Sequence, residues 1–501
     1  MTNVILVSLD TLRADRLGCY GYPRALSPNI DCVARQGTLF HNLLSPHIPT
    51  FPAHTTLFSG RDIFDHRVTN QSDANEPPGG IAMLAEVLQR QGFFTAAADN
   101  MGRWFAQGFE LYRAYDWDTK ATKEWRKGEA VTEAALEILN TAAAQPKPFF
   151  LFMHYWDPHT PYLPPAPFDR IFYEADEKNP ANPSMEQLWS FKTFASYFAE
   201  WMPGVTDIEF PKAQYDAEVA YMDSCLAHLF TRIEELKLTE NTLLVLTADH
   251  GEEMDEHGAW FDHHGLYDTN LRVPLIMRLA GKIPVGRQVG QQITLLDLAP
   301  TILDFLELDP PARKKMAGTS FVPVLTGAAD SGAAAAPGIY ISENTWMKKH
   351  GWRTANWKLI CPLETPDVHG RSEPELYDLN ADPREDRNLA QSMPEIVQQL
   401  TVAMSAHVEA RLAATKQPHP LLTQPISHRS ISSMKAAVPQ DDAVIGHEVN
   451  ASQQAPRGAE KPPVEAGLSG RAFVENSVEA RKRSRAWRRR AARALKRLLR
   501  F

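Results

Sequence analysis

One pattern restricts the fold of this chain most. Short apolar runs end at a polar residue, and segments of helical periodicity separate them. The first run, Val4–Leu9, is interrupted only by Ser8 and stops at Asp10. Further runs of this kind are Phe93–Ala98, Pro148–His154, Thr242–Thr247 and Val273–Met277. Segments between them, such as Ile30–Gly37 and Ile81–Gly92, space apolar residues as an amphipathic helix does. Buried strands that alternate with helices predict an α/β domain, doubly wound around a large and mainly parallel sheet.

A chain of 501 residues is longer than one hydrophobic core usually serves, so we expect more than one domain. The pattern above places the large domain at residues 1–330. After a small-residue linker at 327–338, short strand patterns at 339–342, 351–359 and 375–379 and a helix at 393–411 predict a smaller α+β domain at residues 336–414. Residues 415–477 lose periodicity and fill with Gln, Pro, Ser and Ala, which predicts a disordered linker.

The last residues combine positive charge with a helical apolar face. Residues 480–501 hold eleven Lys or Arg and no acidic residue, whereas the whole chain carries a formal net charge of −9. The apolar face consists of Trp487, Ala491, Leu495, Leu498 and Leu499. We therefore predict a basic amphipathic helix at residues 478–501, with an anionic membrane surface as its partner and nucleic acid disfavoured. A solvated helix, or one folded against the acidic body, is the alternative.

Several classes of protein do not fit the composition. The four cysteines, Cys19, Cys32, Cys225 and Cys361, lack CxxC spacing, so neither a zinc ribbon nor a disulfide framework is expected. The first apolar run is shorter than the core of a signal peptide, and no apolar stretch is long enough to span a bilayer. We expect a cytoplasmic protein, peripheral at the inner face of the membrane if its basic segment binds lipid.

The stretch TADHGEEMDEHGAWFDHHG, Thr247–Gly265, places histidines and acidic residues directly after an apolar run. Asp249 and His250 follow that strand at its carboxyl end, where open α/β sheets bind ligands. Asp10 ends the first strand in the same manner. Carboxylates and an imidazole at one edge of a sheet suit a divalent metal ion. A solvated acidic loop is the alternative, but such a loop does not require clustered histidines.

The segment PTFPAHTTLFSG, residues 49–60, places Thr50 two residues before Pro52. Thr50 suits the N-cap of a helix, because Pro52 lacks an amide hydrogen and fits a first helical turn. A hydroxyl at a helix N-terminus beside a divalent metal is also an activated nucleophile, because the helix dipole and the metal both stabilise its alkoxide. The two interpretations are compatible, and we predict Thr50 as both metal ligand and nucleophile.

The motif HYWDPHTPY, His154–Tyr162, also follows an apolar run. Its Asp157 and His159 are candidates for binding a metal or a substrate oxygen. The Pro-rich and aromatic stretch 161–213 comes next, and it indicates either a wall of the substrate site or a packed peripheral subdomain.

In this order, the segments resemble the sulfatase family of the alkaline phosphatase superfamily over residues 3–392. The resemblance is carried by NVILVSLDTLRADRLGCYGY, FPAHTTLFSGR, PFFLFMHYWDPHTPY, YDAEVAYMD, TADHGEEMDEHG, FDHHGLYDTNLRVPLI and ELYDLNADPREDRNLA. It implies a large α/β domain with a small C-terminal α+β domain. It also implies a divalent metal held by Asp10, Asp249 and His250, with the nucleophile as a further ligand; Asp157 is an additional candidate ligand.

Two positions depart from the usual sulfatase pattern. Sulfatases usually carry two adjacent acidic residues where this chain has Asp10 and Thr11, and the single Asp is more similar to the family's phosphonate and phosphodiester hydrolases. This similarity favours manganese or zinc over calcium or magnesium. Sulfatases also oxidise a Cys or Ser in C/S-x-P-x-R to formylglycine, but a threonine would give a ketone. Thr-Phe-Pro-x-His instead resembles nucleotide pyrophosphatase/phosphodiesterases, whose threonine attacks phosphorus directly.

The resemblance implies further contacts with a tetrahedral anion, for which such donors are suited. His54 stands where sulfatases keep an arginine that holds the modified residue. Asn70 and His159 would contact oxyanion oxygens, and Arg103 loosely matches the family's Gly-Lys-Trp segment. His263 falls where many members place a substrate lysine, and the adjacent His264 is a further substrate-binding candidate.

We therefore expect a metal-dependent hydrolase of phosphate esters (mono- or diesters, or phosphonates) or sulfate esters, with phosphoesters favoured. Thr50 would attack in line without formylglycine, and His159 or His263 would protonate the leaving group. One alternative is a true sulfuric ester hydrolase. Another is a catalytically silent module that binds an anion or a membrane, since fold alone does not fix function.

Overall fold

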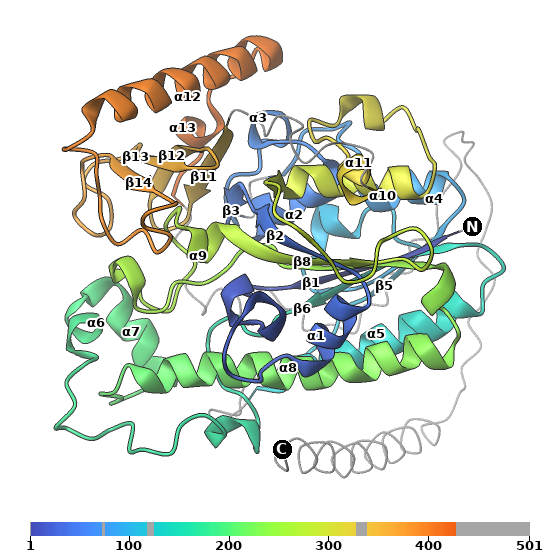
Figure 1. Cartoon of the computed structure of the whole chain (residues 1–501), viewed down its shortest axis with the longest axis horizontal. Coiled ribbons are helices and arrows are strands. Elements are labelled where there is room, and N and C mark those ends of the chain that lie inside the picture. The colour runs from blue at the N-terminus through green and yellow to red at the C-terminus, as the bar shows by residue number, and fades with distance from the viewer. Residues whose placement is uncertain (1, 73–75, 118–124, 327–337, 427–501) are drawn as a thin grey trace, which may run out of the picture. The chain divides into compact units, whose positions relative to one another are not determined.

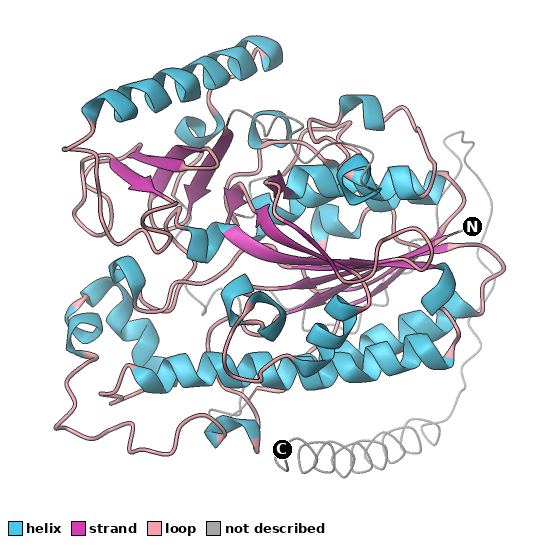
Figure 2. Ribbon diagram, in the orientation of Figure 1, coloured by secondary structure: helices cyan, strands magenta, loops and turns pink. Residues whose placement is uncertain are grey.

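The computed structural model describes residues 2–72, 76–117, 125–326 and 338–426 (Figures 1 and 2). The predicted helix at 478–501, the predicted linker from residue 427 on, and nearly all of the small-residue stretch 327–338 lie outside these residues. In the described part of the chain, no helix combines the length and the apolar character that crossing a bilayer requires.

A nine-stranded sheet lies at the centre of the large α/β part (Figure 2). Its strand order is β10 (Ile293–Thr294), β2 (Thr38–Leu44), β8 (Arg272–Arg278), β7 (Thr242–Thr247), β1 (Asn3–Leu9), β6 (Phe149–Tyr155), β4 (Phe94–Ala98) and β5 (Leu111–Arg113), with β9 (Arg287–Val289) paired to β2. β1 runs parallel to both β6 and β7, and β4 runs parallel to β5 and β6. β8 is antiparallel to its two neighbours. The predicted doubly wound, mainly parallel sheet is confirmed.

Helices cover both faces of this sheet, which explains why its central strands are apolar along their whole length (Figure 1). One face carries α1 (Pro28–Arg35), α5 (Lys127–Ala143) and α8 (Glu209–Glu235). The other carries α2 (Thr50–Ser59), α4 (Leu84–Arg90) and α10 (Leu298–Phe305). The shorter helices are α3 (Ile63–His66), α6 (Glu186–Ser190), α7 (Lys192–Trp201), α9 (Asp268–Leu271) and α11 (Val322–Thr326).

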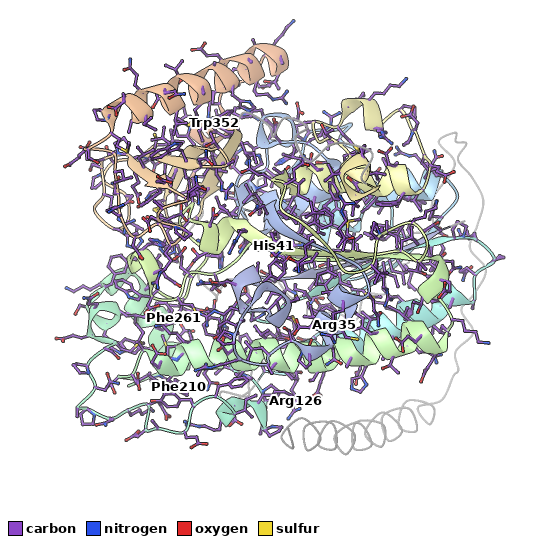
Figure 3. All side chains as sticks on the ribbon, in the orientation of Figure 1. Arg35, His41, Arg126, Phe210, Phe261 and Trp352 are labelled. Atoms are coloured by element: carbon purple, nitrogen blue, oxygen red, sulfur yellow. The ribbon has the colours of Figure 1, made fainter. Side chains whose placement is uncertain are left out.

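A second, five-stranded sheet forms the C-terminal α+β part, as predicted. Its order is β14 (Glu375–Asp378), β13 (Trp357–Pro362), β12 (Lys348–Arg353), β11 (Ile339–Asn344) and β3 (His47–Ile48). α12 (Pro394–Thr415) packs on this sheet, with Leu400 and Met404 in the same core cluster as Trp352, which Figure 3 labels. The predicted domain limits, 1–330 and 336–414, stay a prediction.

The structure differs from the sequence-based expectation at three places. The single strand expected at 351–359 is a hairpin of β12 and β13, because the chain turns after Arg353. β2 was not predicted, because the half-buried His41 and Asn42 interrupt its apolar run at a register shift. The disordered linker does not begin at residue 415: α13 (Pro420–Thr423) follows α12, and its Leu421 is fully buried.

The stretch 161–213 contributes α6 and α7, whose aromatic side chains pack inward. Phe194 and Phe198 have no exposed surface, and the ring of Phe194 stacks on His264 at a centroid distance of 5.2 Å. The stretch is therefore a packed peripheral element that also reaches one of the predicted substrate-binding residues.

Candidate active site

Neighbouring parallel strands bring polar side chains to one edge of the large sheet. Asp10 follows β1, Asp249 and His250 follow β7, and Asp99 follows β4. His154 lies near the end of β6, opposite Ser8 of β1. Because the carboxyl ends of parallel strands share an edge, residues distant in sequence meet there.

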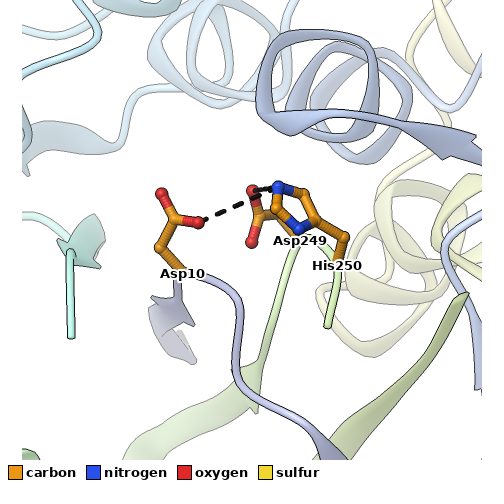
Figure 4. Close-up of side chains that lie close together, drawn as sticks. All are labelled: Asp10, Asp249 and His250. Carbon is orange, nitrogen blue, oxygen red and sulfur yellow. Dashed lines mark ion pairs between the residues drawn. The ribbon is translucent and has the colours of Figure 1, made fainter. Parts of the chain in front are cut away.

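Asp10, Asp249 and His250 each offer one ligand atom to a group whose atoms all lie within 4.8 Å of one another (Figure 4). His250 Nε2 is 3.9 Å from Asp10 Oδ1 and 3.3 Å from Asp249 Oδ2. All three residues are completely buried. Within the described residues, no hydrogen bond reaches either carboxylate oxygen of Asp10 or Oδ2 of Asp249. Buried carboxylates without donors are costly unless a cation neutralises them, so this set fits a divalent metal.

The local backbone holds these ligands in place. Thr11, directly after Asp10, adopts a left-handed conformation with φ of 57°, and its amide donates to Asp249 Oδ1 at 3.3 Å. Tyr215 of α8 donates to the carbonyl oxygen of Thr11 at 2.8 Å. After His250 the chain requires glycine, because a Cβ on Gly251 would overlap the carbonyl oxygen of Thr269. The two strand ends are thus linked to each other around Asp10, Asp249 and His250, which we call the metal-binding set because it is the candidate site for a metal ion.

Thr50 lies in the same group, but it is not the N-cap that the sequence suggested. It is the first residue of α2, Pro49 takes the capping position, and no side chain caps the helix. The Thr50 hydroxyl instead lies 3.1 Å from His250 Nε2 and is fully buried. Two residues earlier, β3 pairs with β11, so the small sheet holds the chain as it enters α2.

His54 lies one helical turn after Thr50 and is engaged by the protein at both ring nitrogens. Its Nδ1 lies 3.0 Å from the Thr50 carbonyl oxygen, and its Nε2 lies 2.9 Å from Ser8 Oγ. Asp249 Oδ2 is 3.7 Å from Nδ1. Burial lowers the pKa of His54. Its predicted contact with substrate stays a prediction; in the structure, His54 connects Thr50 to β1.

The rings of His159 and His263 are neighbours, tilted by 53° to each other, beside the candidate metal-binding set. Their ring centroids are 5.0 Å apart, and the ring of His263 is 4.7 Å from that of His250. Among the described residues, His159 Nε2 has no hydrogen-bond partner. Burial lowers the pKa of His159 to about 4. Burial also opposes the charged form of His263, but Glu252 and Asp262 outweigh it and raise its pKa to about 9.

Two predicted residues lie apart from this group. Asp157 is not among the three residues whose ligand atoms gather there, and its Oδ1 lies 3.3 Å from the buried Nζ of Lys127. Its role as an additional metal ligand stays a prediction. His264 turns toward the C-terminal part, where its Nε2 is 2.8 Å from Nε2 of His369. The neighbouring positions 263 and 264 therefore face different partners.

Asn70 and Arg103 are held by other parts of the chain. Asn70 donates from Nδ2 to the carbonyl oxygen of Pro425 at 2.9 Å, just beyond α13. Arg103 pairs with Glu76 Oε1 at 3.1 Å, and its guanidinium lies 4.4 Å from the ring centroid of Trp104. The substrate-binding roles of Asn70 and Arg103 stay predictions.

Two residues of this sheet edge were missed by sequence reasoning. His154 Nε2 lies 3.4 Å from Asp10 Oδ2, and its Nδ1 lies 2.9 Å from Asp99 Oδ1. Burial opposes the charged form of His154, but Asp10 and Asp99 outweigh it and raise its pKa to about 10. The signal for Asp99 was available, because it follows the predicted strand Phe93–Ala98 as Asp10 follows the first strand.

Comparison with known proteins agrees with this arrangement. The family model described as Sulfatase matches residues 2–308, and the model described as N-sulphoglucosamine sulphohydrolase, C-terminal, matches residues 255–411. N-acetylglucosamine-6-O-sulfatase of Bacteroides thetaiotaomicron is 25% identical over 476 residues, covering 77% of this chain and 82% of that protein. The multifunctional alkaline phosphatase superfamily protein PehA of Trinickia caryophylli is 26% identical over 399 residues, covering 64% and 77%.

The fold is shared with solved structures. The phosphonate monoester hydrolase of Agrobacterium radiobacter superposes with a TM-score of 0.66 at 20% identity, covering 83% of this chain and 96% of that one. The Sulfatase model alone spans more than half of the sequence, and it includes Asp10, Thr50, Asp249 and His250. The protein therefore belongs to the sulfatase family, a group of ester hydrolases in the alkaline phosphatase superfamily.

Proposed function

We propose that the protein is a metal-dependent hydrolase of phosphate esters (mono- or diesters, or phosphonates) or sulfate esters, in which Thr50 is the nucleophile. One observation carries the proposal. The Thr50 hydroxyl is 3.1 Å from His250 Nε2, inside a fully buried group that also holds the unpartnered oxygens of Asp10 and Asp249. A divalent ion held by this group, with manganese or zinc favoured, would lower the pKa of the hydroxyl and neutralise charge on the ester oxygens.

In this proposal, the residues around Thr50 take part in two successive displacement steps. Thr50 loses its hydroxyl proton to solvent, and Oγ1 attacks phosphorus or sulfur in line with the leaving oxygen. The new bond from Oγ1 forms as the bond to the leaving oxygen breaks, and His159 or His263 gives that oxygen a proton. Water then attacks the ester on Thr50 and restores the hydroxyl, releasing phosphate from a monoester, a phosphomonoester from a diester, a phosphonate from a phosphonate ester, or sulfate from a sulfate ester.

The positions of His159 and His263 support a role as donors to the ester oxygens. His159 Nε2 is buried and has no partner among the described residues. Its Nδ1 lies 2.7 Å from the Thr160 carbonyl oxygen, so Nε2 donates to an ester oxygen only when the ring is protonated. His263 stands between His159 and His250 at ring distances of 5.0 and 4.7 Å. A donor in a buried site acts strongly on developing negative charge, because water does not screen it. The predicted roles of Asn70, His54, Arg103 and His264 in holding substrate are part of the same proposal.

Phosphoesters are the favoured substrates, since a threonine cannot become formylglycine. The relatives support both classes: one is named a sulfatase, one is named a multifunctional member of the alkaline phosphatase superfamily, and a structural neighbour is a phosphonate monoester hydrolase. A true sulfuric ester hydrolase is therefore the second candidate.

The test is turnover of four aryl esters by purified protein loaded in turn with Mn²⁺, Zn²⁺, Mg²⁺ and Ca²⁺. We expect kcat/KM for p-nitrophenyl phosphate, its diester or its phosphonate to exceed that for p-nitrophenyl sulfate. Quenching during turnover should leave phosphate on the peptide that contains Thr50. Hydrolysis of the sulfate ester alone would establish the second candidate. Absence of both turnover and bound metal would establish the silent, anion-binding module instead.

A further inference from the structure

We propose that Asp99 and His154 are positioning residues that fix the carboxylate of Asp10, so that one of its oxygens faces His154 and the other faces the metal-binding set. The inference rests on the proposed metal-dependent function and adds residues that act on the metal ligand rather than on substrate.

The two oxygens of Asp10 have different neighbours. Oδ2 lies 3.4 Å from His154 Nε2, and Oδ1 lies 3.9 Å from His250 Nε2. A carboxylate rotates about its Cβ–Cγ bond unless a neighbour holds one oxygen. Among the described residues, neither oxygen accepts a hydrogen bond, and His154 is the nearer of the two histidines that pair with Asp10. His154 is therefore the group that can set this rotation.

His154 is itself held from several sides. Asp99 Oδ1 lies 2.9 Å from Nδ1, which directs Nε2 toward Asp10. The imidazole is nearly parallel to the ring of Phe152 at 6.1 Å and meets the ring of Trp156 at 5.0 Å. Tyr115 donates its hydroxyl to the carbonyl oxygen of His154. These contacts restrict both the position and the rotation of the His154 ring.

Asp99 is fixed in the same way. Tyr112 of β5 donates its hydroxyl to Asp99 Oδ2, which leaves Oδ1 for His154. The chain of contacts thus crosses the sheet edge from β5, past β4, to β6 and β1. Asp99, His154 and Asp10 have no exposed surface, so water does not compete for these contacts.

A carboxylate behind a histidine is a familiar support for metal sites, and removing such outer partners typically weakens metal affinity about 10- to 100-fold. Here the histidine supports a carboxylate ligand, and the acid behind it supports the histidine. Neither residue has a polar contact with Thr50, His159 or His263 in the structure. The ring of His154 also packs on that of His54 at a centroid distance of 4.8 Å, but its polar contact with the metal-binding set is the one to Asp10.

The experiment is a calorimetric titration of Mn²⁺ into the metal-free, full-length wild type, Asp99→Asn and His154→Gln. Both variants should bind Mn²⁺ about 10- to 100-fold more weakly than wild type. Asp223→Asn is the matched control: Asp223 is equally buried but holds the backbone amides of Asn29 and Ile30 at the start of α1. Its Mn²⁺ affinity should equal that of wild type even where its melting temperature falls.

Tyr112→Phe is a milder variant, which serves where the other two do not fold. It removes the hydroxyl that orients Asp99 and that also accepts from the Gly102 amide at 2.9 Å, and it should still weaken Mn²⁺ binding measurably. Folded Asp99→Asn or Tyr112→Phe protein with wild-type Mn²⁺ affinity would overturn the inference and leave the proposed function standing. A wild type that binds no divalent ion would overturn both.

Discussion

The hydroxyl of Thr50 lies 3.1 Å from Nε2 of His250, although the two residues are 200 positions apart in sequence. Thr50 begins α2, and His250 follows β7, so the contact exists only when that helix is seated on the large sheet. Both side chains are fully buried. The proposed nucleophile therefore shares its neighbour with the proposed metal ion, and its reactivity depends on the ligands that surround it.

Thr50→Val and Thr50→Ser separate the hydroxyl from the shape of the side chain. Valine keeps the volume but has no nucleophile, and kcat/KM on the best aryl ester should fall at least about 10³-fold. Serine keeps the hydroxyl and should stay within about 10-fold of wild type. Thr55→Ala is the control, since Thr55 lies on the same helix but donates to the Phe51 carbonyl oxygen. Activity in Thr50→Val close to wild type would rule out Thr50 as nucleophile.

Removal of divalent metal should lower both activity and stability. Without a metal ion, both oxygens of Asp10 and Oδ2 of Asp249 are buried and accept no hydrogen bond from the described residues. Ions that bind only the folded state stabilise it by mass action. At 100 times its Kd, Mn²⁺ should add about 2.7 kcal/mol to the free energy of unfolding. Chelated protein should regain turnover and melting temperature with Mn²⁺ or Zn²⁺. Chelated protein with full turnover would contradict the metal requirement.

The strand-end residues could be predicted from sequence because their signal is local. An apolar run followed by Asp10, or by Asp249 and His250, places these side chains at the rim of a parallel sheet before any tertiary contact is known. The larger sheet could be predicted for the same reason. β2 could not, because His41 and Asn42 break its run while the flanking residues remain buried.

Residues that act through a partner could not be predicted, since the partner is distant in sequence. His154 looked like the end of an apolar strand, and only its contacts with Asp10 and Asp99 give it a role. His264 shows the converse: it adjoins His263 in sequence, yet its ring meets His369 of the C-terminal part. Adjacent positions in a turn can face opposite directions, and sequence does not report which way each side chain points.

Lowering the pH should reduce the free energy of unfolding, and His47 should account for part of this loss. This histidine is buried next to Ser342 Oγ, 2.9 Å from its Nδ1, and burial lowers its pKa to about 3. The rings of His66 and Tyr340 face it, His407 adds to the shift, and no carboxylate among the described residues pairs with it. Between pH 6.5 and pH 3 the unfolded chain binds a proton that the folded chain excludes, so stability falls as pH falls.

From pH 7.5 to pH 5 this one histidine should cost about 2 kcal/mol of unfolding free energy. His47→Asn should reduce the pH dependence of urea unfolding. His41→Asn is the control, because His41 is only half-buried and its Nε2 lies 3.0 Å from Gln288 Oε1. Equal pH dependence in wild type and His47→Asn would show that His47 does not carry it.

Lys127→Met should destabilise the protein strongly. Lys127 Nζ is buried, lies 3.3 Å from Asp157 Oδ1, and donates to the His159 carbonyl oxygen at 2.7 Å. Removing the cation leaves an unpaired buried carboxylate, which costs about 3–5 kcal/mol. Lys127→Met combined with Asp157→Asn removes the stranded charge and should recover part of that loss in urea unfolding. Additive losses in the double variant would show that the two side chains are not coupled.

Truncation should reveal whether the segment after α12 limits access to Asn70. Its side-chain amide donates to the Pro425 carbonyl oxygen at 2.9 Å, so an ester oxygen that binds Asn70 competes with this contact. A chain that stops after Gln417 should therefore show a lower KM than one that stops after Ile426, with kcat little changed. Its melting temperature should also fall, because the fully buried Leu421 is lost from the core under α12. The chain that stops after Ile426 keeps both contacts and is the control for deleting residues 427–501. Equal KM values in the two truncated proteins would place Asn70 outside the substrate site.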